Sequence, residues 1–360
     1  MGNRTFQEMI DEQKKGMPPV LKGDLTGKTV MVTGANSGIG FEAAKHFATM
    51  NPARLVIVCR TIAKAQDSIK QIQAETGYKN AEPMALELSS FRSISESVTQ
   101  ATKTLDRLDI LVENAAVSTG YEYIPTEDGW ETMLQVNSLG PALHALLLLP
   151  LISKTAREHS VVPRIVVVSS EVIFFPDGTI GSDALAAVNT LQTLSSKEYC
   201  TPEILRIRYV QSKSMFVNSK HRFPFSHKNP SVLNTMFVRK LATLLPDNIV
   251  PVSLNPGFCV SGLRRKHENG DEAERFKKME DEFGYTSEEG SRQIIYAAIG
   301  GKDQELRGAF TSYSQVLEIS DWMLSDEGKK AEEKTWTEML EVLNQADERI
   351  PQIVKEFLKA

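Results

Sequence analysis

A tyrosine and a lysine four positions apart, Tyr209 and Lys213, have the clearest chemical use in this sequence. On a helix, residues i and i+4 lie on one face, so the lysine ammonium would approach the phenol. A nearby ammonium stabilises a phenolate and lowers the tyrosine pKa from its ordinary value of about 10, which favours proton transfer at neutral pH. The pattern Y-x-x-x-K is common by chance, so its meaning depends on the rest of the chain.

A glycine-rich turn lies near the amino end, in the segment VMVTGANSGIGFEAAKHF. It places Gly34, Gly38 and Gly40 between an apolar run and a helical pattern. Such glycines let the backbone approach a pyrophosphate, whose charge the free N–H groups at the helix start stabilise. Tight strand-to-helix turns also use glycine for structural reasons, so the turn alone leaves both interpretations open.

The glycine spacing T-G-x-x-x-G-x-G resembles that of the short-chain dehydrogenase/reductase family. Further matching residues follow in order: Asn114, Asn137, Ser170, Tyr209, Lys213 and the segment NPGFCVS. The resemblance covers the chain from Leu21 to the carboxyl end. It is closest to retinol-dehydrogenase-like and fungal secondary-metabolism members, given the segment VCRT and the long stretch between Ser170 and Tyr209. It implies a Rossmann-type domain that transfers hydride with a nicotinamide cofactor.

The resemblance assigns catalytic roles to Ser170, Tyr209, Lys213 and Asn137. Tyr209 would be the acid/base, and Lys213 would lower its pKa. Ser170 would hydrogen-bond the substrate oxygen, with Ser169 as the alternative serine. Asn137 would support a water relay to Lys213. Asn has poor helix propensity, so Asn137 indicates either a local helix distortion or a tolerated surface residue.

The resemblance also predicts the residues that contact the cofactor. An NAD enzyme would carry an acid after the second apolar run, to bind the ribose 2′-hydroxyl. This chain has Cys59 followed by Arg60, which favours NADP(H) through its 2′-phosphate. The expected set is Gly34, Ser37, Gly38, Ile39, Gly40, Arg60, Glu87, Leu88, Asn114, Ala115, Tyr209, Lys213, Pro256, Gly257 and Ser261.

Several of these segments depart from the family pattern. Glu87 stands where Asp is usual, Glu113 replaces an Asn, and Ser261 replaces a Thr while keeping the hydroxyl. Ala116 replaces a Gly and adds a Cβ where backbone and cofactor lie close, which puts the affinity in doubt.

Short runs rich in Val, Ile and Leu alternate with helical patterns. The predicted strands are Thr29–Thr33, Arg54–Cys59, Met84–Leu88, Asp109–Val112, Arg164–Ser169, Ile249–Asn255 and Ala309–Ser312. Apolar strands separated by helices indicate an α/β fold with a doubly wound parallel sheet covered on both faces. We predict a single domain over residues 25–360, after an N-terminal extension, residues 1–24, that breaks at Pro18-Pro19.

Three helical segments carry further expectations. The apolar run PALHALLLLPLI, from Pro141 to Ile152, is too short to span a bilayer and predicts a buried helix. The run HENGDEAERFKKMEDEF predicts a solvated helical face. Trp336, Leu340 and Leu343 recur at helical spacing, which favours core packing.

An atypical insertion, residues 214–231, follows Lys213 directly. It contains basic and aromatic residues, no acid, and two prolines, Pro224 and Pro230, that a helix interior does not accept. Without it, YVQSK would join VLNTMFVRKLATLL as one amphipathic helix. One hypothesis is a retained intron, and its rival is a true loop near the substrate or a subunit contact. Sequencing the transcript separates the two.

Composition limits the classes of function. The chain has 360 residues and a formal net charge of −5, so it lacks the basic footprint of a nucleic-acid-binding protein. Three widely spaced cysteines show no metal-ligand spacing and favour a reducing compartment. The amino end lacks the apolar core of a signal peptide, so a cytoplasmic location is expected. The resemblance implies a homodimer, although the insertion would lie in or beside that surface.

The sequence therefore predicts an NADP-dependent reductase of a ketone or aldehyde, or an oxidase of the alcohol. Apolar residues in VIFFP and LAAVNTLQTL, between Ser170 and Tyr209, favour a lipophilic small molecule, with a role in secondary metabolism, although core packing also explains them. An alternative is a catalytically silent nucleotide-binding protein, impaired by the insertion after Lys213. A sugar-nucleotide epimerase also uses Y-x-x-x-K but usually has a different glycine spacing, so it ranks third.

Overall fold

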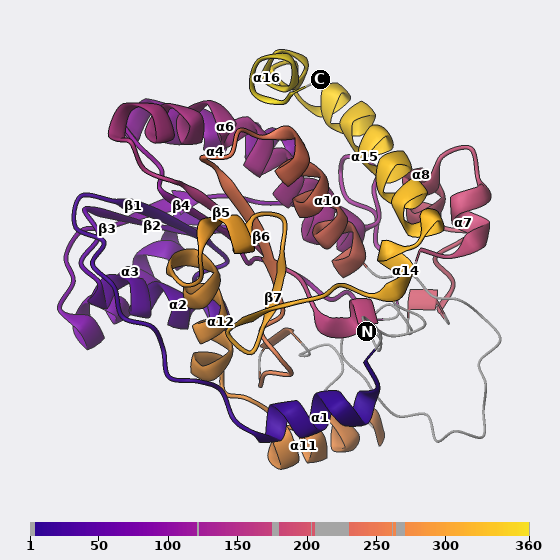
Figure 1. The fold of residues 1–360 in the computed structure, drawn as a ribbon, viewed down its shortest axis with the longest axis horizontal. Helices are drawn as coiled ribbons and strands as arrows, with labels where there is room; N and C mark the ends of the chain where they lie inside the picture. Colours follow the sequence, from indigo (N-terminus) through magenta and orange to yellow (C-terminus); the bar gives the residue numbers. More distant parts are fainter. Residues whose placement is uncertain are drawn as a thin grey trace.

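The central feature of the fold is a mostly parallel β-sheet between two helical layers (Figure 1). The computed structural model describes residues 4–120, 122–174, 180–202, 204–205, 230–260, 262–263 and 271–359. Within these residues the sheet has the order β3-β2-β1-β4-β5-β6-β7-β8. The strands are β1 Thr29–Thr33, β2 Arg54–Cys59, β3 Ala81–Ala85, β4 Ile110–Glu113, β5 Arg164–Val168, β6 Val250–Leu254, β7 Phe310–Ser312 and β8 Gln315–Leu317.

The predicted doubly wound α/β fold is confirmed, and six of the predicted strands lie within one residue of the observed ones at each end. The prediction of Met84–Leu88 is wrong, because β3 covers Ala81–Ala85. Pro83 cannot donate to a ladder, yet it is accepted here because β3 is at the edge of the sheet. The sequence segment from Leu86 to Leu88 is therefore a loop after the strand.

The last strand, β8, was not predicted, and it pairs antiparallel with β7. Tyr313 and Ser314 join the two strands with φ values of 52° and 56°, the left-handed geometry of a tight hairpin turn. Such turns usually contain Asn or Gly, and this one contains neither, so the sequence gives no signal for it.

Two layers of helices bury the sheet on both faces (Figure 1). One layer consists of α4 Phe91–Thr104, α6 Gly140–His159, α10 Pro230–Leu244, α15 Asp326–Ala346 and α16 Ile350–Phe357. The other consists of α2 Gly38–Thr49, α3 Ile62–Thr76 and α12 Ser287–Ile299. Trp336 of α15 stacks on Phe237 of α10, with ring centroids 5.9 Å apart. Leu343 is fully buried and Leu340 packs against the same core, so the predicted packing role is confirmed.

The apolar run near residue 145 lies in α6 and is buried in the core, as predicted. The helical stretch Thr132–His159 has the length and composition of a membrane span, but 83% of its apolar window is buried inside the molecule. This burial is expected of a helix that packs against the sheet in the core.

The described residues also contain several short helices that connect the longer elements. They are α5 Thr132–Leu134, the π-helix η1 Gln135–Leu139, the 3₁₀ helix η2 Glu171–Phe174, α7 Ser182–Ala186, α8 Thr190–Ser195, α13 Asp303–Leu306 and α14 Asp321–Leu324. Helix α10 begins at Pro230, and its apolar face, which includes Val232, Leu233 and Met236, is buried. Pro is accepted there because the first turn of a helix needs no N–H donor. Most of the atypical insertion lies outside the described residues.

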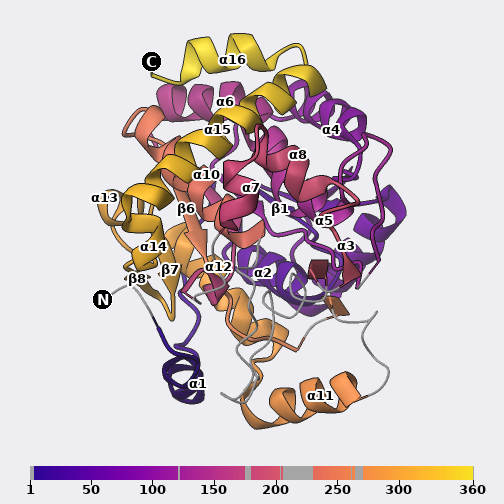
Figure 2. The same ribbon diagram turned by 90° about the vertical axis from the view of Figure 1, so that its right-hand side faces the viewer.

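The N-terminal residues form helix α1, Phe6–Lys14, which lies beside α11, Asp271–Phe283 (Figure 2). Thr5 and Glu8 make a capping box at its start. The helix ends before Gly16, which has φ +81°. The α11 segment is a helix with a solvated face, as predicted, on which Lys277, Lys278 and Asp281 are exposed. Its other side packs against Ile10 in a small apolar cluster.

Candidate active site

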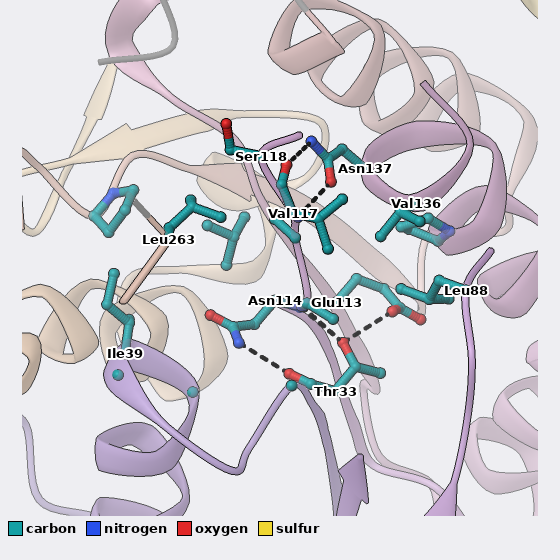
Figure 3. A pocket seen from close by; sticks show the side chains of 18 of the residues that line it. Thr33, Ile39, Leu88, Glu113, Asn114, Val117, Ser118, Val136, Asn137 and Leu263 are labelled. Atoms are coloured by element: carbon teal, nitrogen blue, oxygen red, sulfur yellow. Dashed lines mark hydrogen bonds between the residues drawn. The ribbon is translucent and has the colours of Figure 1, made fainter. Parts of the chain in front are cut away.

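A cavity of about 710 Å³ opens at the carboxyl ends of the parallel strands (Figure 3). In doubly wound folds this edge is where ligands bind, because the chain crosses to opposite faces of the sheet on either side of β1. The cavity contains most of the predicted site residues. Its described lining includes Gly34, Ser37, Gly38, Ile39, Gly40, Arg60, Glu87, Leu88, Asn114, Ala115, Asn137, Ser170, Pro256 and Gly257.

The glycine turn joins β1 to α2 and lies against the end of β4. Ser37 is the N-cap residue, and its side chain makes no capping hydrogen bond. The first-turn N–H groups of α2 therefore have no side-chain cap and can face an anion. A Cβ on Gly40 would lie 2.3 Å from Asn114 Nδ2 and 2.7 Å from the Gly34 carbonyl oxygen. The turn thus requires glycine at position 40 to pack this closely against Asn114.

Asn114 fixes the end of β4 to the end of β1 (Figure 3). Its Nδ2 donates to the Thr33 carbonyl oxygen at 2.9 Å, and its backbone N–H donates to Thr33 Oγ1 at 2.9 Å. Asn114 is therefore a support of the glycine turn as well as part of the cavity wall.

Glu113, the residue that departs from the family pattern, is buried beside this network. Thr33 Oγ1 lies 3.2 Å from its Oε2, and His144 Nδ1 of α6 lies 2.6 Å from its Oε1. The side chains of Glu113 and His144 are both fully buried. The carboxylate thus has a specific partner in the core, and the pair links β4 to α6. The sequence reasoning noted Glu113 but missed His144, which is 31 positions further along the chain.

Arg60 and Lys64 bring two cationic side chains to the rim of the cavity beyond β2. Both residues are exposed, and Thr61, between them, caps α3 by accepting from the Lys64 N–H. Burial raises the pKa of the neighbouring Cys59 thiol to about 11, so this position carries no negative charge near pH 7. Lys64 was missed by the sequence reasoning, although its place in the first turn of α3, four residues after Arg60, is a signal that could have found it.

Glu87 and Leu88 lie in the loop after β3. Glu87 Oε1 accepts from the Ser89 N–H at 3.1 Å, and the Glu87 N–H donates to Ser93 Oγ at 3.0 Å. Leu88 is buried and lines the cavity. The longer Glu87 side chain therefore turns back to its own loop.

Asn137 occupies a π-helical turn, η1, directly before α6. Its Oδ1 accepts from the Val117 N–H at 2.9 Å, and its Nδ2 donates to the Val117 carbonyl oxygen at 3.0 Å (Figure 3). Of the two interpretations of Asn137, a local helix distortion is therefore correct. Single π-turns of this kind are frequent at functional sites.

Ser169 and Ser170 both line the cavity at the end of β5, but they differ in burial and in hydrogen-bond partners. Ser169 is buried, and its Oγ lies 2.9 Å from Thr235 Oγ1 of α10. Ser170 is half-buried and lines the cavity, with a long 3.5 Å contact to the Val172 N–H. The hydroxyl of Ser170 is therefore the better placed of the two to bind a ligand.

Three predicted site residues, Tyr209, Lys213 and Ser261, lie outside the described residues. Met9, from the N-terminal helix, and Glu171, directly after Ser170, also line the cavity and were missed by the sequence reasoning. Burial raises the pKa of Glu171 to about 7, and Arg4 and Tyr313 oppose this shift. Met9 belongs to no motif, so only the fold brings it to the site, whereas the position of Glu171 next to Ser170 is a signal that could have found it.

Comparison with known proteins agrees with this architecture. Residues 28–190 match the family model described as short chain dehydrogenase. The chain is 29% identical to short chain dehydrogenase sor7 of Hypocrea jecorina over 317 residues, which cover 84% of this chain and 80% of that protein. It is 28% identical to short-chain dehydrogenase anuD of Penicillium roqueforti over 336 residues, 91% of this chain and 80% of that protein.

Among solved structures, L-sorbose reductase from Gluconobacter frateurii, complexed with NADPH and L-sorbose, shares the fold. The TM-score is 0.51 at 18% identity, over 77% of this chain and 92% of that one. With the ordered motifs, the sheet topology and the fungal relatives, these findings place the chain: it belongs to the short-chain dehydrogenase/reductase family. It is accordingly an oxidoreductase by family.

Proposed function

We propose that this protein is an NADP(H)-dependent oxidoreductase that reduces a ketone or aldehyde of a lipophilic small molecule, or oxidises the corresponding alcohol. One observation carries the proposal: the glycine turn at α2, Asn114, Asn137 and Ser170 line one cavity. A nucleotide pyrophosphate at the start of α2 and a substrate carbonyl at Ser170 would then both lie in this one cavity. The related L-sorbose reductase fold was solved with NADPH, which supports this choice of cofactor.

The preference for NADP(H) rests on charge at the end of β2. Arg60 and Lys64 offer two cations to a 2′-phosphate, and the neutral Cys59 thiol stands where an NAD enzyme would carry a carboxylate. A phosphate gains from paired cations, whereas the ribose hydroxyl of NAD would gain little from either.

Each of the site residues would have its own role in the reaction. Bound NADPH would supply the hydride. The Ser170 hydroxyl would donate to the substrate oxygen as negative charge develops there. Tyr209 would give this oxygen its proton, and Lys213 would hold the tyrosine pKa low enough for that step. Asn137 would keep the Val117 segment in place, and its role in a water relay to Lys213 remains part of the proposal.

The lining of the cavity supports a lipophilic substrate. Apolar side chains from several elements line the same cavity as Ser170: Met9, Val117, Met133, Val172, Phe258 and Leu263. A ligand pocket that is mostly apolar, with a few polar groups in fixed positions, selects an apolar molecule with one reactive polar group. The two fungal relatives make a role in secondary metabolism a reasonable context for such a substrate.

A pair of variants tests the proposal against the silent-binder alternative. Tyr209→Phe should lose nearly all NADPH-dependent carbonyl reduction while its NADPH dissociation constant changes little, and Ser170→Ala should lose turnover by about 100-fold or more. The matched control is Ser169→Ala, which should keep most of the turnover. If the wild-type chain binds NADPH but a broad carbonyl panel shows no turnover, the silent-binder alternative is correct.

A further inference from the structure

Helix α1 contacts the candidate active site, and it also packs against α11, which lies beside it (Figure 2). Met9 lines the cavity, while Ile10 packs against Phe276, Met279 and Phe283 of α11. Residues from the first and last quarters of the chain thus meet beside the segment Pro256–Cys259. The motifs that carry the family resemblance begin after α1, so they give this helix no role.

Gln13 makes the polar part of this contact. Its Nε2 donates to the Phe258 carbonyl oxygen at 2.8 Å and to the Phe283 carbonyl oxygen at 2.6 Å. Its Oε1 accepts from the Phe258 N–H at 2.9 Å. The side chain is nearly fully buried, so these bonds have little competition from water. The Gln13 side-chain amide therefore bonds both backbone polar groups of Phe258, as a neighbouring strand would, and also bonds the last residue of α11.

Tyr285 strengthens the same junction from the other side. Its hydroxyl donates to the Gln13 carbonyl oxygen at 2.9 Å, and its backbone N–H donates to the Phe258 carbonyl oxygen at 2.8 Å. Gly257 allows this packing. It has φ +83°, and a Cβ there would lie 2.7 Å from the Tyr285 ring and 3.3 Å from Gln13 Oε1. The backbone of the cavity wall is thus held between Gln13 and Tyr285.

We infer that Gln13 is a positioning residue for the ligand end of the site, through its hold on Pro256–Cys259. The inference rests on the proposed function, in which Pro256 and Gly257 lie beside the nicotinamide. The glycine turn and Arg60, which would bind the other end of the cofactor, have no described contact with Gln13. A change at Gln13 should therefore weaken binding at one end of the cofactor and leave the other end unchanged.

The test compares two ligands on purified full-length variants. Gln13→Met keeps the length and packing of the side chain and removes its hydrogen bonds, and Gln13→Ala removes both. For each we expect the NADPH dissociation constant to rise roughly tenfold, because buried acceptors lose their partners. The dissociation constant of 2′,5′-ADP, which lacks the nicotinamide end, should stay within about twofold. The control is Lys14→Ala on the same helix, which loses an exposed ion pair with Glu282 and should change neither ligand.

Hydrogen exchange gives a second readout that needs no ligand. In Gln13→Met, exchange should accelerate roughly tenfold at the Phe258 and Tyr285 amides, and stay unchanged in β1 and α2. Equal loss of NADPH and 2′,5′-ADP affinity, or unchanged exchange at Phe258, would overturn the inference. A wild-type chain that binds 2′,5′-ADP and NADPH equally well would also overturn it. If the wild type binds neither ligand, the proposed cofactor fails, and the exchange data alone decide whether Gln13 holds the segment.

Discussion

The side chain of Asn137 forms two hydrogen bonds with the main chain of one residue, Val117, at 2.9 Å and 3.0 Å. The π-turn that contains Asn137 brings its amide level with the segment that follows β4. This pairing holds the cavity wall between Asn114 and Thr119 and connects it to the start of α6.

Asn137→Ala should therefore loosen that wall. We expect the free energy of unfolding to fall by about 1–3 kcal/mol, because the Val117 N–H and carbonyl group lose their partners. NADPH binding should weaken in parallel. Urea denaturation of the variant beside Asn137→Asp, which keeps the acceptor for the Val117 N–H, measures the effect. Equal stability of wild type and Asn137→Ala would show that water replaces the amide at no cost.

The buried pair Glu113 and His144 should behave as a coupled unit. His144→Leu removes a hydrogen-bond partner of the fully buried Glu113 side chain and should lower the free energy of unfolding by about 1–3 kcal/mol. Glu113→Asn, which restores the residue that the family pattern has here, should lower that cost when combined with His144→Leu. A double-mutant cycle measures the coupling. Strict additivity of the two single effects would contradict a direct interaction.

Glu171 should make stability depend on pH. Burial raises its pKa from the usual 4.5 to about 7 in the folded chain. Between these values the folded state binds more protons than the unfolded state, so the free energy of unfolding falls as pH rises from 4.5 to 7 and levels off above 7. The shift corresponds to roughly 3 kcal/mol in total. Glu171→Gln has no titrating carboxyl and therefore lacks this pH-dependent loss of unfolding free energy.

The difference in unfolding free energy between Glu171→Gln and the wild type should therefore rise, in favour of the variant, by roughly 3 kcal/mol from pH 4.5 to pH 8. Denaturant titrations at several pH values measure it. Glu158→Gln, at an exposed position on α6, is a control for general charge effects and should show no such trend. A constant difference for Glu171→Gln across this range would mean that folding does not raise the pKa of this carboxyl.

The two cations at the end of β2 should set the choice of cofactor. Arg60→Ala and Lys64→Ala should each weaken NADPH binding by about tenfold and leave NADH binding nearly unchanged, because only NADPH carries the 2′-phosphate. Arg92→Ala, an exposed arginine paired with Glu96 on α4, is the control. Loss of both cofactors in equal measure would place Arg60 and Lys64 in a structural role.

Much of the fold could be predicted because the parallel strands, buried on both faces, are nearly continuous apolar runs. The glycine turn, Asn114 and Ser170 could be placed because they follow such runs directly. The edge strand β3 was misplaced because Pro83 is tolerated only where one side of the strand has no partner. Met9, Gln13, His144 and Glu171 could not be assigned a role, since their contacts join segments far apart in the chain.

The central claim is that this chain binds and uses NADP(H). A fluorescence titration of NADPH into the purified 360-residue chain, with NADH in parallel, tests it most directly. The account predicts saturable NADPH binding that is at least about tenfold tighter than NADH binding, because Arg60 and Lys64 meet the 2′-phosphate. A folded chain that binds neither cofactor, or that prefers NADH, would contradict it.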